Sequence, residues 1–383
     1  MTTASTLAFS EHFGDLKDPR IERTKRHLLM DVVLLAIVAV LCDADGWEQI
    51  TEFGRQKEEW LKTVLRLPHG IPSADTIARV FQRINPEEFQ RCFLRWTGVL
   101  ANELGLKQIE QIGIDGKTLR SSADRASGKR PLHLVSAWST ANRLVLGQQA
   151  VDGKSNEITA IPALLKLLEI KGAIVSIDAI GCQKSIAEQI VHAGGDYVLS
   201  LKDNQPSLHI AVAEHFEKLH TTDFAGPEGE QVRRHVTREQ CGDTTITREY
   251  YLAPLPKELC HFRDSWCKLN SIGQVITTVE QGDDMKIGIR FYISSLRPRV
   301  KRFAHAVRSH WTIENSLHWV LDMTFREDDS RLHKGHGAEN MALIRRLVLS
   351  LLHRDANPGS LRIKRKRAAW NHEAALNLLA NAG

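Results

Sequence analysis

The stretch His-Trp-Thr-Ile-Glu-Asn-Ser-Leu-His-Trp-Val-Leu-Asp, residues 310–322, combines an apolar helical pattern with one central carboxylate. Its apolar residues recur at helical spacing, which predicts an amphipathic helix with one face in the core. Glu314 lies on this helix, with His310 and His318 four residues away on either side. A carboxylate on a half-buried helix is costly unless a positive charge meets it. We therefore predict that Glu314 helps to bind a divalent metal ion.

Two aspartates far upstream are the predicted partners of Glu314. Asp115 and Asp178 each follow a short apolar run that predicts a buried strand. If these strands are neighbours, the two carboxylates lie close together, and a cation between them relieves their repulsion. Two alternatives stay open. Asp115 begins an Asp-Gly pair, which is also a hairpin signal, and Asp178 could cap a helix that begins near Gln183.

Carboxylate ligands predict magnesium or manganese, because these hard ions prefer oxygen and no cysteine is placed to bind a softer one. A zinc site on His310, Glu314 and His318 is the rival. The two histidines cannot share one ion, because eight helical residues span about 12 Å. They are expected to contact DNA or to orient Glu314. Three acids that hold two ions can activate water and stabilise a leaving oxygen at a phosphodiester. The nearby acids Asp322, Glu327 and Asp328 are possible substitutes for Glu314.

The order of predicted elements favours an α/β fold. Residues 1–105 read as a helical N-terminal domain. From about 108 the pattern gives three strands, a helix, a strand, a helix and a strand, which is the layout of a ribonuclease-H-like mixed sheet. Residues 206–296 read as a strand-rich insertion, after which long helices resume. We therefore expect a second domain over 106–383 that contains the β-rich insertion.

Several basic residues are candidates for DNA contacts. A turn and N-cap signal at 70–76 opens a short helix with outward arginines, which predicts either a helix-turn-helix-like DNA reader or a helical cap. The run Leu361–Arg367 has five basic residues in seven and is either a phosphate contact or a solvated helix face. Trp311 and Trp319 are assigned to the core, with stacking on a base as the alternative. The candidate DNA-binding residues from these patterns are Arg79, Arg83, Lys117, Arg120, Arg308, His310, Lys364 and Arg365.

Composition sets the broad class. The 383 residues are 42% hydrophobic and 25% charged, as in an ordinary globular protein, and the net charge of +5 mildly favours a polyanionic partner. The apolar run Val32–Cys42 is too short to span a bilayer. The start of the chain has no signal-peptide pattern, and the six cysteines form no CxxC pair. We expect a cytoplasmic protein without membrane contact.

Several blocks of the sequence resemble one known family. They are Ile-Asp-Gly-Lys-Thr-Leu-Arg (114–120), Asp-Ala-Ile-Gly-Cys-Gln-Lys (178–184), Gly-Gly-Asp-Tyr (194–197), Tyr-Ile-Ser-Ser (292–295) and the His-Trp-x-Ile-Glu-Asn-x-Leu-His-Trp of 310–319. In this order, and nearly end to end, they are similar to the H-repeat-associated, ISAs-type insertion-sequence transposases of the DDE superfamily.

The resemblance implies a DNA transposase that cuts insertion-sequence ends and joins them to target DNA. Asp115, Asp178 and Glu314 would be its catalytic, metal-binding acids, with Mg²⁺ or Mn²⁺ as cofactor. Lys202 and Asn204 match a family Lys-x-Asn-Gln motif and would contact DNA. Double-stranded DNA would be the partner, bound by a homodimer in the synaptic complex, in the bacterial cytoplasm at the nucleoid.

The match to related transposases is incomplete around Glu314. Where those proteins have a Tyr-x2-Arg-x3-Glu-x6-Lys signature, this chain has Val307, His310, Glu314 and Leu321, so only the glutamate agrees. Two other readings remain: a stand-alone metal-dependent DNA endonuclease, and a domesticated DNA-binding protein without activity.

Overall fold

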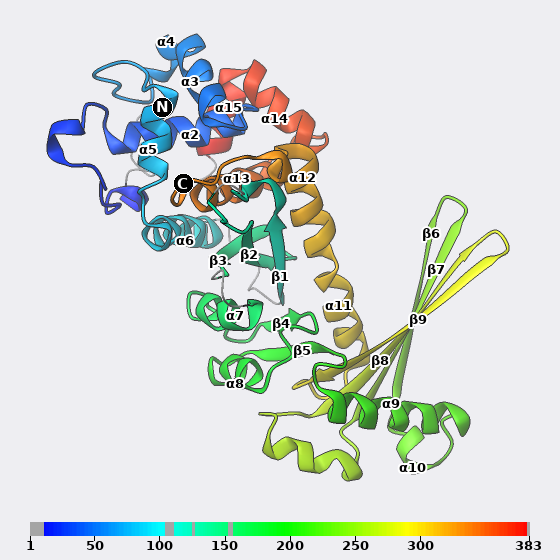
Figure 1. The fold of residues 1–383 in the computed structure, drawn as a ribbon. Coiled ribbons are helices and arrows are strands. Elements are labelled where there is room, and N and C mark those ends of the chain that lie inside the picture. The colour runs from blue at the N-terminus through cyan, green and yellow to red at the C-terminus, as the bar shows by residue number, and fades with distance from the viewer. Residues whose placement is uncertain (1–10, 104–110, 125–126, 152–155, 381–383) are drawn as a thin grey trace.

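A nine-stranded mixed sheet runs through the protein. The computed structural model describes residues 11–103, 111–124, 127–151 and 156–380. The predicted domain boundary near residue 105 lies outside these ranges. The strands are β1 (Gln111–Leu119), β2 (Leu132–Ser139), β3 (Leu144–Ala150), β4 (Ile174–Ile177), β5 (Asp196–Leu201), β6 (Arg233–Cys241), β7 (Thr244–Pro254), β8 (Ser271–Gln281) and β9 (Asp284–Ser294). Their order in the sheet is β3-β2-β1-β4-β5-β9-β8-β7-β6 (Figure 1).

The first five strands form a ribonuclease-H-like core, as the sequence predicted. β1, β2 and β3 are antiparallel neighbours, whereas β4 pairs in parallel with both β1 and β5. Side chains alternate across a strand, so β4 faces two layers. Val175 packs with α7 (Glu157–Leu165) and α8 (Lys184–His192), while Ile174 packs with α11 (Val300–His310). β4 is therefore covered on both faces, and its neighbour β1 is the middle one of these five strands.

The insertion extends this sheet and forms no separate one. β9 pairs antiparallel with β5, and the hairpins β8–β9 and β6–β7 follow outward. Their tips project well beyond the body of the protein (Figure 1). The strand-rich insertion also contains the helix α9 (Pro206–Thr221), which was not predicted and which begins with proline at its first turn. A short helix, α10 (Gly226–Gly229), follows α9.

The helices at the two ends of the chain share one apolar core. N-terminal residues such as Leu35 and Phe81 belong to the same buried cluster as Leu347 and Ala375 from the C-terminal helices. Figure 1 shows the two groups packed together beyond β1–β3. The N-terminal helices are α2 (Leu29–Leu41), α3 (Trp47–Gln56), α4 (Glu58–Leu61), α5 (Ala74–Phe81) and α6 (Pro86–Glu103), and the C-terminal ones are α12 (Trp319–Phe325), α13 (Gly337–Arg354), α14 (Leu361–Trp370) and α15 (His372–Ala380).

Two helix starts have side-chain caps, and the first lies in the predicted N-cap stretch at 70–76. Ser73 accepts a hydrogen bond from the Thr76 amide at the start of α5, and Asn85 accepts from the amides of Glu87 and Glu88 at the start of α6. Each side chain satisfies an amide that has no partner inside its helix. Within the described residues, none of the helices has the length and apolar character needed to cross a membrane.

Candidate active site

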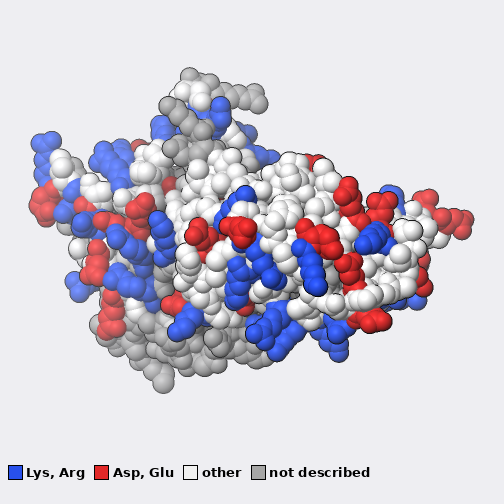
Figure 2. Space-filling model, turned by 90° about the horizontal axis from the view of Figure 1, so that it is seen from below, with Lys and Arg blue, Asp and Glu red and all other residues white. Residues whose placement is uncertain are grey.

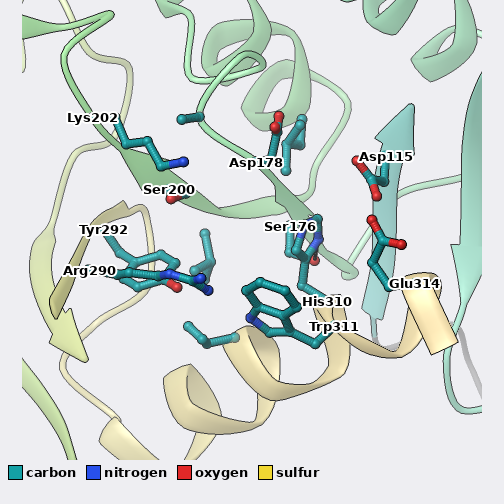
Figure 3. Close-up of a pocket in the computed structure, with 14 residues that line it drawn as sticks. Asp115, Ser176, Asp178, Ser200, Lys202, Arg290, Tyr292, His310, Trp311 and Glu314 are labelled. Atoms are coloured by element: carbon teal, nitrogen blue, oxygen red, sulfur yellow. Dashed lines mark hydrogen bonds between the residues drawn. The ribbon is translucent and has the colours of Figure 1, made fainter. Parts of the chain in front are cut away.

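Asp115 and Asp178 lie at the same level of the sheet. The parallel ladder between β1 and β4 ends at the pair Ile114 and Ile177, and each aspartate directly follows one residue of that pair. The expectation that the two strands are neighbours is confirmed. Both side chains line a cavity of about 200 Å³, and Glu314 also lines it, with its carboxylate beside that of Asp115 (Figure 3).

The hairpin-turn alternative for Asp115 is wrong. β1 continues without a turn to Leu119, with Asp115 opposite Ser136 and Gly116 opposite Val135 on β2. A Cβ atom at position 116 would overlap the carboxylate of Glu157, which would have to move. The absence of a side chain at 116 allows Glu157 to pack against the strand beside Asp115.

Glu314 reaches Asp115 from a helix with an irregular turn. The helix α11 continues into the π-helical turn η4 (Glu314–His318) and then into α12. Such single π-turns are frequent at functional sites. Glu314 and His318 on this turn and Asp115 on β1 present ligand atoms that all lie within 4.8 Å of one another. This donor set of two carboxylates and one imidazole fits a divalent cation.

The carboxyl groups of Asp115 and Glu314 have opposite pKa shifts. Burial, and then the negative charge of Glu314, raise the pKa of Asp115 to about 8. The contact with His318 holds the pKa of Glu314 at about 2. Asp115 therefore holds a proton near neutral pH when no cation is bound, and Glu314 is ionised. A divalent cation would favour the ionised form of both.

Asp178 lies outside this cluster and is held by its own turn. Its Oδ1 accepts hydrogen bonds from the amides of Ile180 and Gly181, at 3.1 and 3.4 Å. It therefore caps the turn after β4 and does not cap α8, whose N-cap residue is Gln183. Burial, followed by the charge of Glu157, raises the pKa of Asp178.

Asn204 faces the protein, in contrast to its predicted contact with DNA. Its Nδ2 donates to the carbonyl of Ala179 at 2.5 Å, and the neighbouring Gln205 donates to the carbonyl of Cys182 at 3.0 Å. These bonds tie the loop after β5 to the turn that carries Asp178. Lys202 in the same motif is exposed and lines the cavity beside Asp178 (Figure 3), a position compatible with the predicted DNA contact.

His310 also points inward. Its Nδ1 lies 3.2 Å from Oγ of Ser176 on β4, and burial lowers its pKa to about 4, so the ring is neutral. It does not belong to the cluster of Asp115, Glu314 and His318. His310, Glu314 and His318 therefore do not form the alternative zinc site. His310 instead packs the helix against the sheet.

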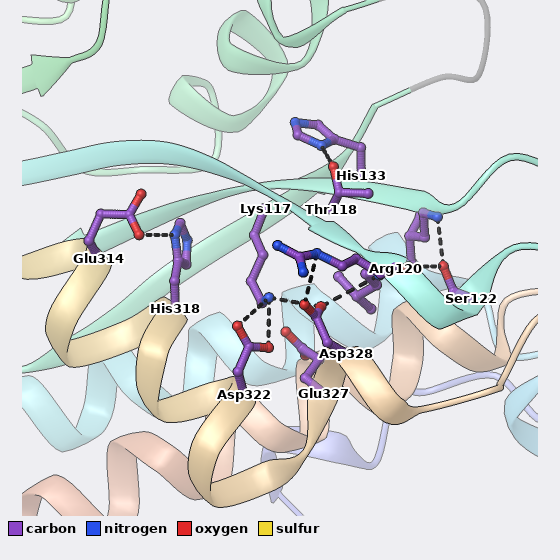
Figure 4. Close-up of polar contacts among 12 residues, drawn as sticks. Lys117, Thr118, Arg120, Ser122, His133, Glu314, His318, Asp322, Glu327 and Asp328 are labelled. Carbon is purple, nitrogen blue, oxygen red and sulfur yellow. Dashed lines mark hydrogen bonds and ion pairs between the residues drawn. The ribbon is translucent and has the colours of Figure 1, made fainter.

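The basic residues after Asp115 are paired with acids of the same chain. Lys117 is only 8% exposed, and its ammonium lies 2.8 Å from Asp322 and 3.1 Å from Asp328 (Figure 4). The predicted contact of Lys117 with DNA is thus replaced by a tether between β1 and α12. Arg120 is exposed and lies 3.3 Å from Asp328.

The acids considered as substitutes for Glu314 are engaged elsewhere. Asp322 and Asp328 bind Lys117, and Glu327 forms a fully buried ion pair with Arg346 at 3.0 Å. Glu314 is therefore the acid on this segment that faces Asp115.

The remaining residues predicted to contact DNA differ in their solvent exposure. Arg79 and Arg83 are exposed on and just after α5. Arg308 donates from Nε and Nη2 to the carboxylate of Glu239 and so links α11 to β6. Lys364 and Arg365 are buried, which corrects the prediction that they contact phosphates. Their helix packs on the shared core, and the charges are met by backbone carbonyls.

An aromatic and basic groove next to the cavity was not predicted. It has a volume of about 580 Å³ and shares Arg290, Tyr292, Val307 and Trp311 with the acidic cavity. The guanidinium of Arg290 lies 4.3 Å from the Trp311 ring centre. Trp311 is 40% exposed and Trp319 is 59% exposed, so their assignment to the core was wrong. The sequence feature that indicates this groove is the position of Trp311, which lies three residues before Glu314 and outside the apolar stripe of the helix.

Comparison with known proteins identifies the family of this chain. Residues 107–351 match the family described as Transposase DDE domain, and residues 10–97 match one described as DDE_Tnp_1-associated. The chain belongs to the DDE transposase family.

Two relatives from Escherichia coli cover nearly the whole chain. YncI of strain O157:H7 is 38% identical over 96% of this chain and 93% of its own length. The H repeat-associated protein YhhI of strain K12 is 37% identical over 97% of this chain and 98% of its own. Both have the word transposase in their names, and this chain is likewise a DNA transposase by family. A piggyBac transposase synaptic complex with hairpin DNA aligns with a TM-score of 0.39 at 10% identity, over 97% of this chain and 75% of that one.

Proposed function

We propose that this transposase cuts DNA at the ends of an insertion sequence and joins the freed 3′ hydroxyl to target DNA. Asp115, Asp178 and Glu314 are the proposed catalytic acids, and Mg²⁺ or Mn²⁺ is the proposed cofactor. The observation that carries the proposal is the convergence of the Asp115 and Glu314 carboxylates at one cavity that Asp178 also lines. When bound, the ion would activate the attacking oxygen and stabilise the leaving oxygen.

The protein's own residues would position the reacting groups. Asp115 is fixed by its place in the central strand, and Asp178 by the turn that it caps. Lys202 and Arg290 put positive charge around the cavity where a phosphate would approach. Fixed ligands and fixed charges lower the barrier because they need no rearrangement during the reaction.

Double-stranded DNA is the proposed partner. The groove beside the cavity supports it, because arginine and aromatic side chains together bind phosphates and bases. The face shown in Figure 2 has basic and acidic side chains interspersed. On this face we therefore expect DNA binding to depend on such local contacts. Because two element ends must be held together, we expect a homodimer in the DNA-bound complex, with the residues before 105 binding the ends.

The test is to remove each acid without changing its shape. Asp115→Asn, Asp178→Asn and Glu314→Gln should each abolish cleavage of end DNA, while binding of the same DNA persists. The double variants should be little worse than the single ones, because the acids act as a unit. Normal cleavage by all three single variants would refute the proposed site.

A labelled 3′-hydroxyl DNA end separates the proposal from its enzyme rival. A transposase should join this end to target DNA, whereas a stand-alone endonuclease should cut DNA without forming joined products. A domesticated DNA-binding protein should give neither product. The assay therefore assigns the chain to one of the three classes.

A further inference from the structure

His318 is a buried polar side chain directed at the proposed metal site. Its side chain is 7% exposed, and its Nδ1 lies 3.6 Å from Oδ2 of Asp115 and 3.7 Å from Oε2 of Glu314 (Figure 4). Among the described residues these carboxylates are its polar contacts, and its Nε2 is buried without a hydrogen-bond partner. No other part of the described structure competes for the ring's nitrogen atoms.

The spacing of these atoms suits ligands of one ion. Two ligand atoms that are each about 2.1 Å from an octahedral ion lie about 3.0 Å apart when adjacent and about 4.2 Å apart when opposite. The distances from His318 to both carboxylates fall within that range. We propose that Nδ1 of His318 is a nitrogen ligand of the ion bound by Asp115 and Glu314, and that this ligand makes the site prefer Mn²⁺ to Mg²⁺. The inference rests on the proposed function.

The preference follows from ligand chemistry. Magnesium is a hard ion that binds oxygen and gives up its water reluctantly. Transition-metal ions accept imidazole nitrogen more readily, and manganese also tolerates carboxylates. His310 cannot take this role, because its Nδ1 faces Ser176 and lies outside the cluster. The site is therefore expected to have mixed oxygen and nitrogen ligands, in place of the oxygen-only site that three acids would form.

Pulsed electron paramagnetic resonance of Mn²⁺ added to the full-length protein without DNA tests this directly. The wild-type spectrum should contain the ¹⁴N coupling of a coordinated imidazole. His318→Asn places an amide near the position of Nδ1, so Mn²⁺ should still bind while the nitrogen coupling disappears. The ratio of Mn²⁺ to Mg²⁺ affinity, measured by calorimetry, should fall about tenfold. His310→Ala is the matched control and should keep the coupling.

Two results would overturn the inference. One is a wild-type spectrum in which Mn²⁺ depends on Asp115 and Glu314 but shows no nitrogen coupling. The other is a coupling that survives in His318→Asn. The first result can be obtained without a His318 variant. The inference can therefore be refuted even if His318→Asn does not fold. Both results leave the transposase proposal standing, because that proposal depends on cleavage and joining by the wild type and the acid variants.

Discussion

At the scale of single residues, the surroundings decide how each carboxylate behaves. Asp115 lies on a central strand with little access to water, whereas the Glu314 side chain is 54% exposed and contacts His318. Burial disfavours the charged form and raises the pKa of Asp115, whereas the contact with His318 favours the charged form and lowers the pKa of Glu314. The sequence alone shows two similar acids, and only their surroundings make them different.

The raised pKa of Asp115 predicts how stability depends on pH without metal. The folded state keeps a proton on Asp115 up to about pH 8, while the unfolded chain releases it above its ordinary value of 3.8. This contribution to stability is complete below the unfolded pKa and is lost as the pH rises through 8. In chelator, thermal unfolding should therefore show wild type losing stability relative to Asp115→Asn over that window, by a few kcal/mol. A difference that stays constant with pH would contradict the assignment.

Lys117 allows a second test at this scale. Lys117→Met would leave Asp322 and Asp328 without their buried cation, and we expect a loss of about 2 kcal/mol in the free energy of unfolding. Because the tether holds α12 to β1, Mn²⁺ affinity should fall as well. Arg120→Met is the matched control. Arg120 is 83% exposed and shares Asp328, so its loss should change stability by less than about 1 kcal/mol. Equal losses in both variants would rule out the tether.

At the scale of elements, two basic helices have opposite roles. The residues Arg79 and Arg83 of the α5 region point to solvent, while α14 buries Lys364 and Arg365. Both segments are rich in arginine or lysine, so charge alone does not distinguish them. The difference is the core beneath them: α5 needs only its apolar stripe to pack, whereas α14 fits between the N-terminal helices and α12 and carries its charges inward.

This contrast gives a prediction for α5. Arg79→Ala with Arg83→Ala should weaken binding to element ends and leave unfolding unchanged, because the Arg79–Asp75 pair at 3.6 Å is exposed and contributes little. The salt dependence of binding should fall by about one unit for each phosphate that the variant no longer binds. Arg91→Ala, an exposed arginine on α6, is the control in the same titration. If the double variant binds ends like wild type, α5 is a structural cap.

At the scale of the whole molecule, one side chain joins both ends of the chain. Arg365 donates to the carbonyls of Val40, Ala44 and Thr324 and to the carboxylate of Asp45. It thereby connects the end of α2, the end of α12 and α14. The two sequence regions expected as separate domains are held together by these bonds and by the shared apolar core.

Replacing Arg365 should therefore affect folding and not DNA affinity. Arg365→Leu leaves several buried acceptors without a donor. It should lower the free energy of unfolding, measured by chemical denaturation, by about 4 kcal/mol. Affinity for DNA, measured below the unfolding temperature, should stay unchanged. Arg362→Ala removes an exposed arginine from the same helix and should change stability by less than about 0.5 kcal/mol. Loss of DNA affinity in Arg365→Leu without loss of stability would restore the phosphate-contact interpretation.

The sequence by itself determined the fold class, the order of the core elements and the three acids. Apolar runs such as Ile112–Ile114 and Ile174–Ile177 are local signals, and an acid directly after each run is visible without coordinates. The helical period around Glu314 likewise depends only on nearby residues. These features could be predicted because short-range patterns decide them.

Only the tertiary structure decided which polar residues face one another. Lys117 meets acids more than 200 residues away, Asn204 bonds to the turn of Asp178, and His318 meets Asp115 across the sheet edge. The sequence predicts DNA contacts for Lys117 and Asn204, and for His318 a contact either with DNA or with Glu314, because a charged or polar residue has the same local pattern at a surface and in a buried pair. Burial and pairing depend on contacts between distant segments, and those exist only once the chain has folded.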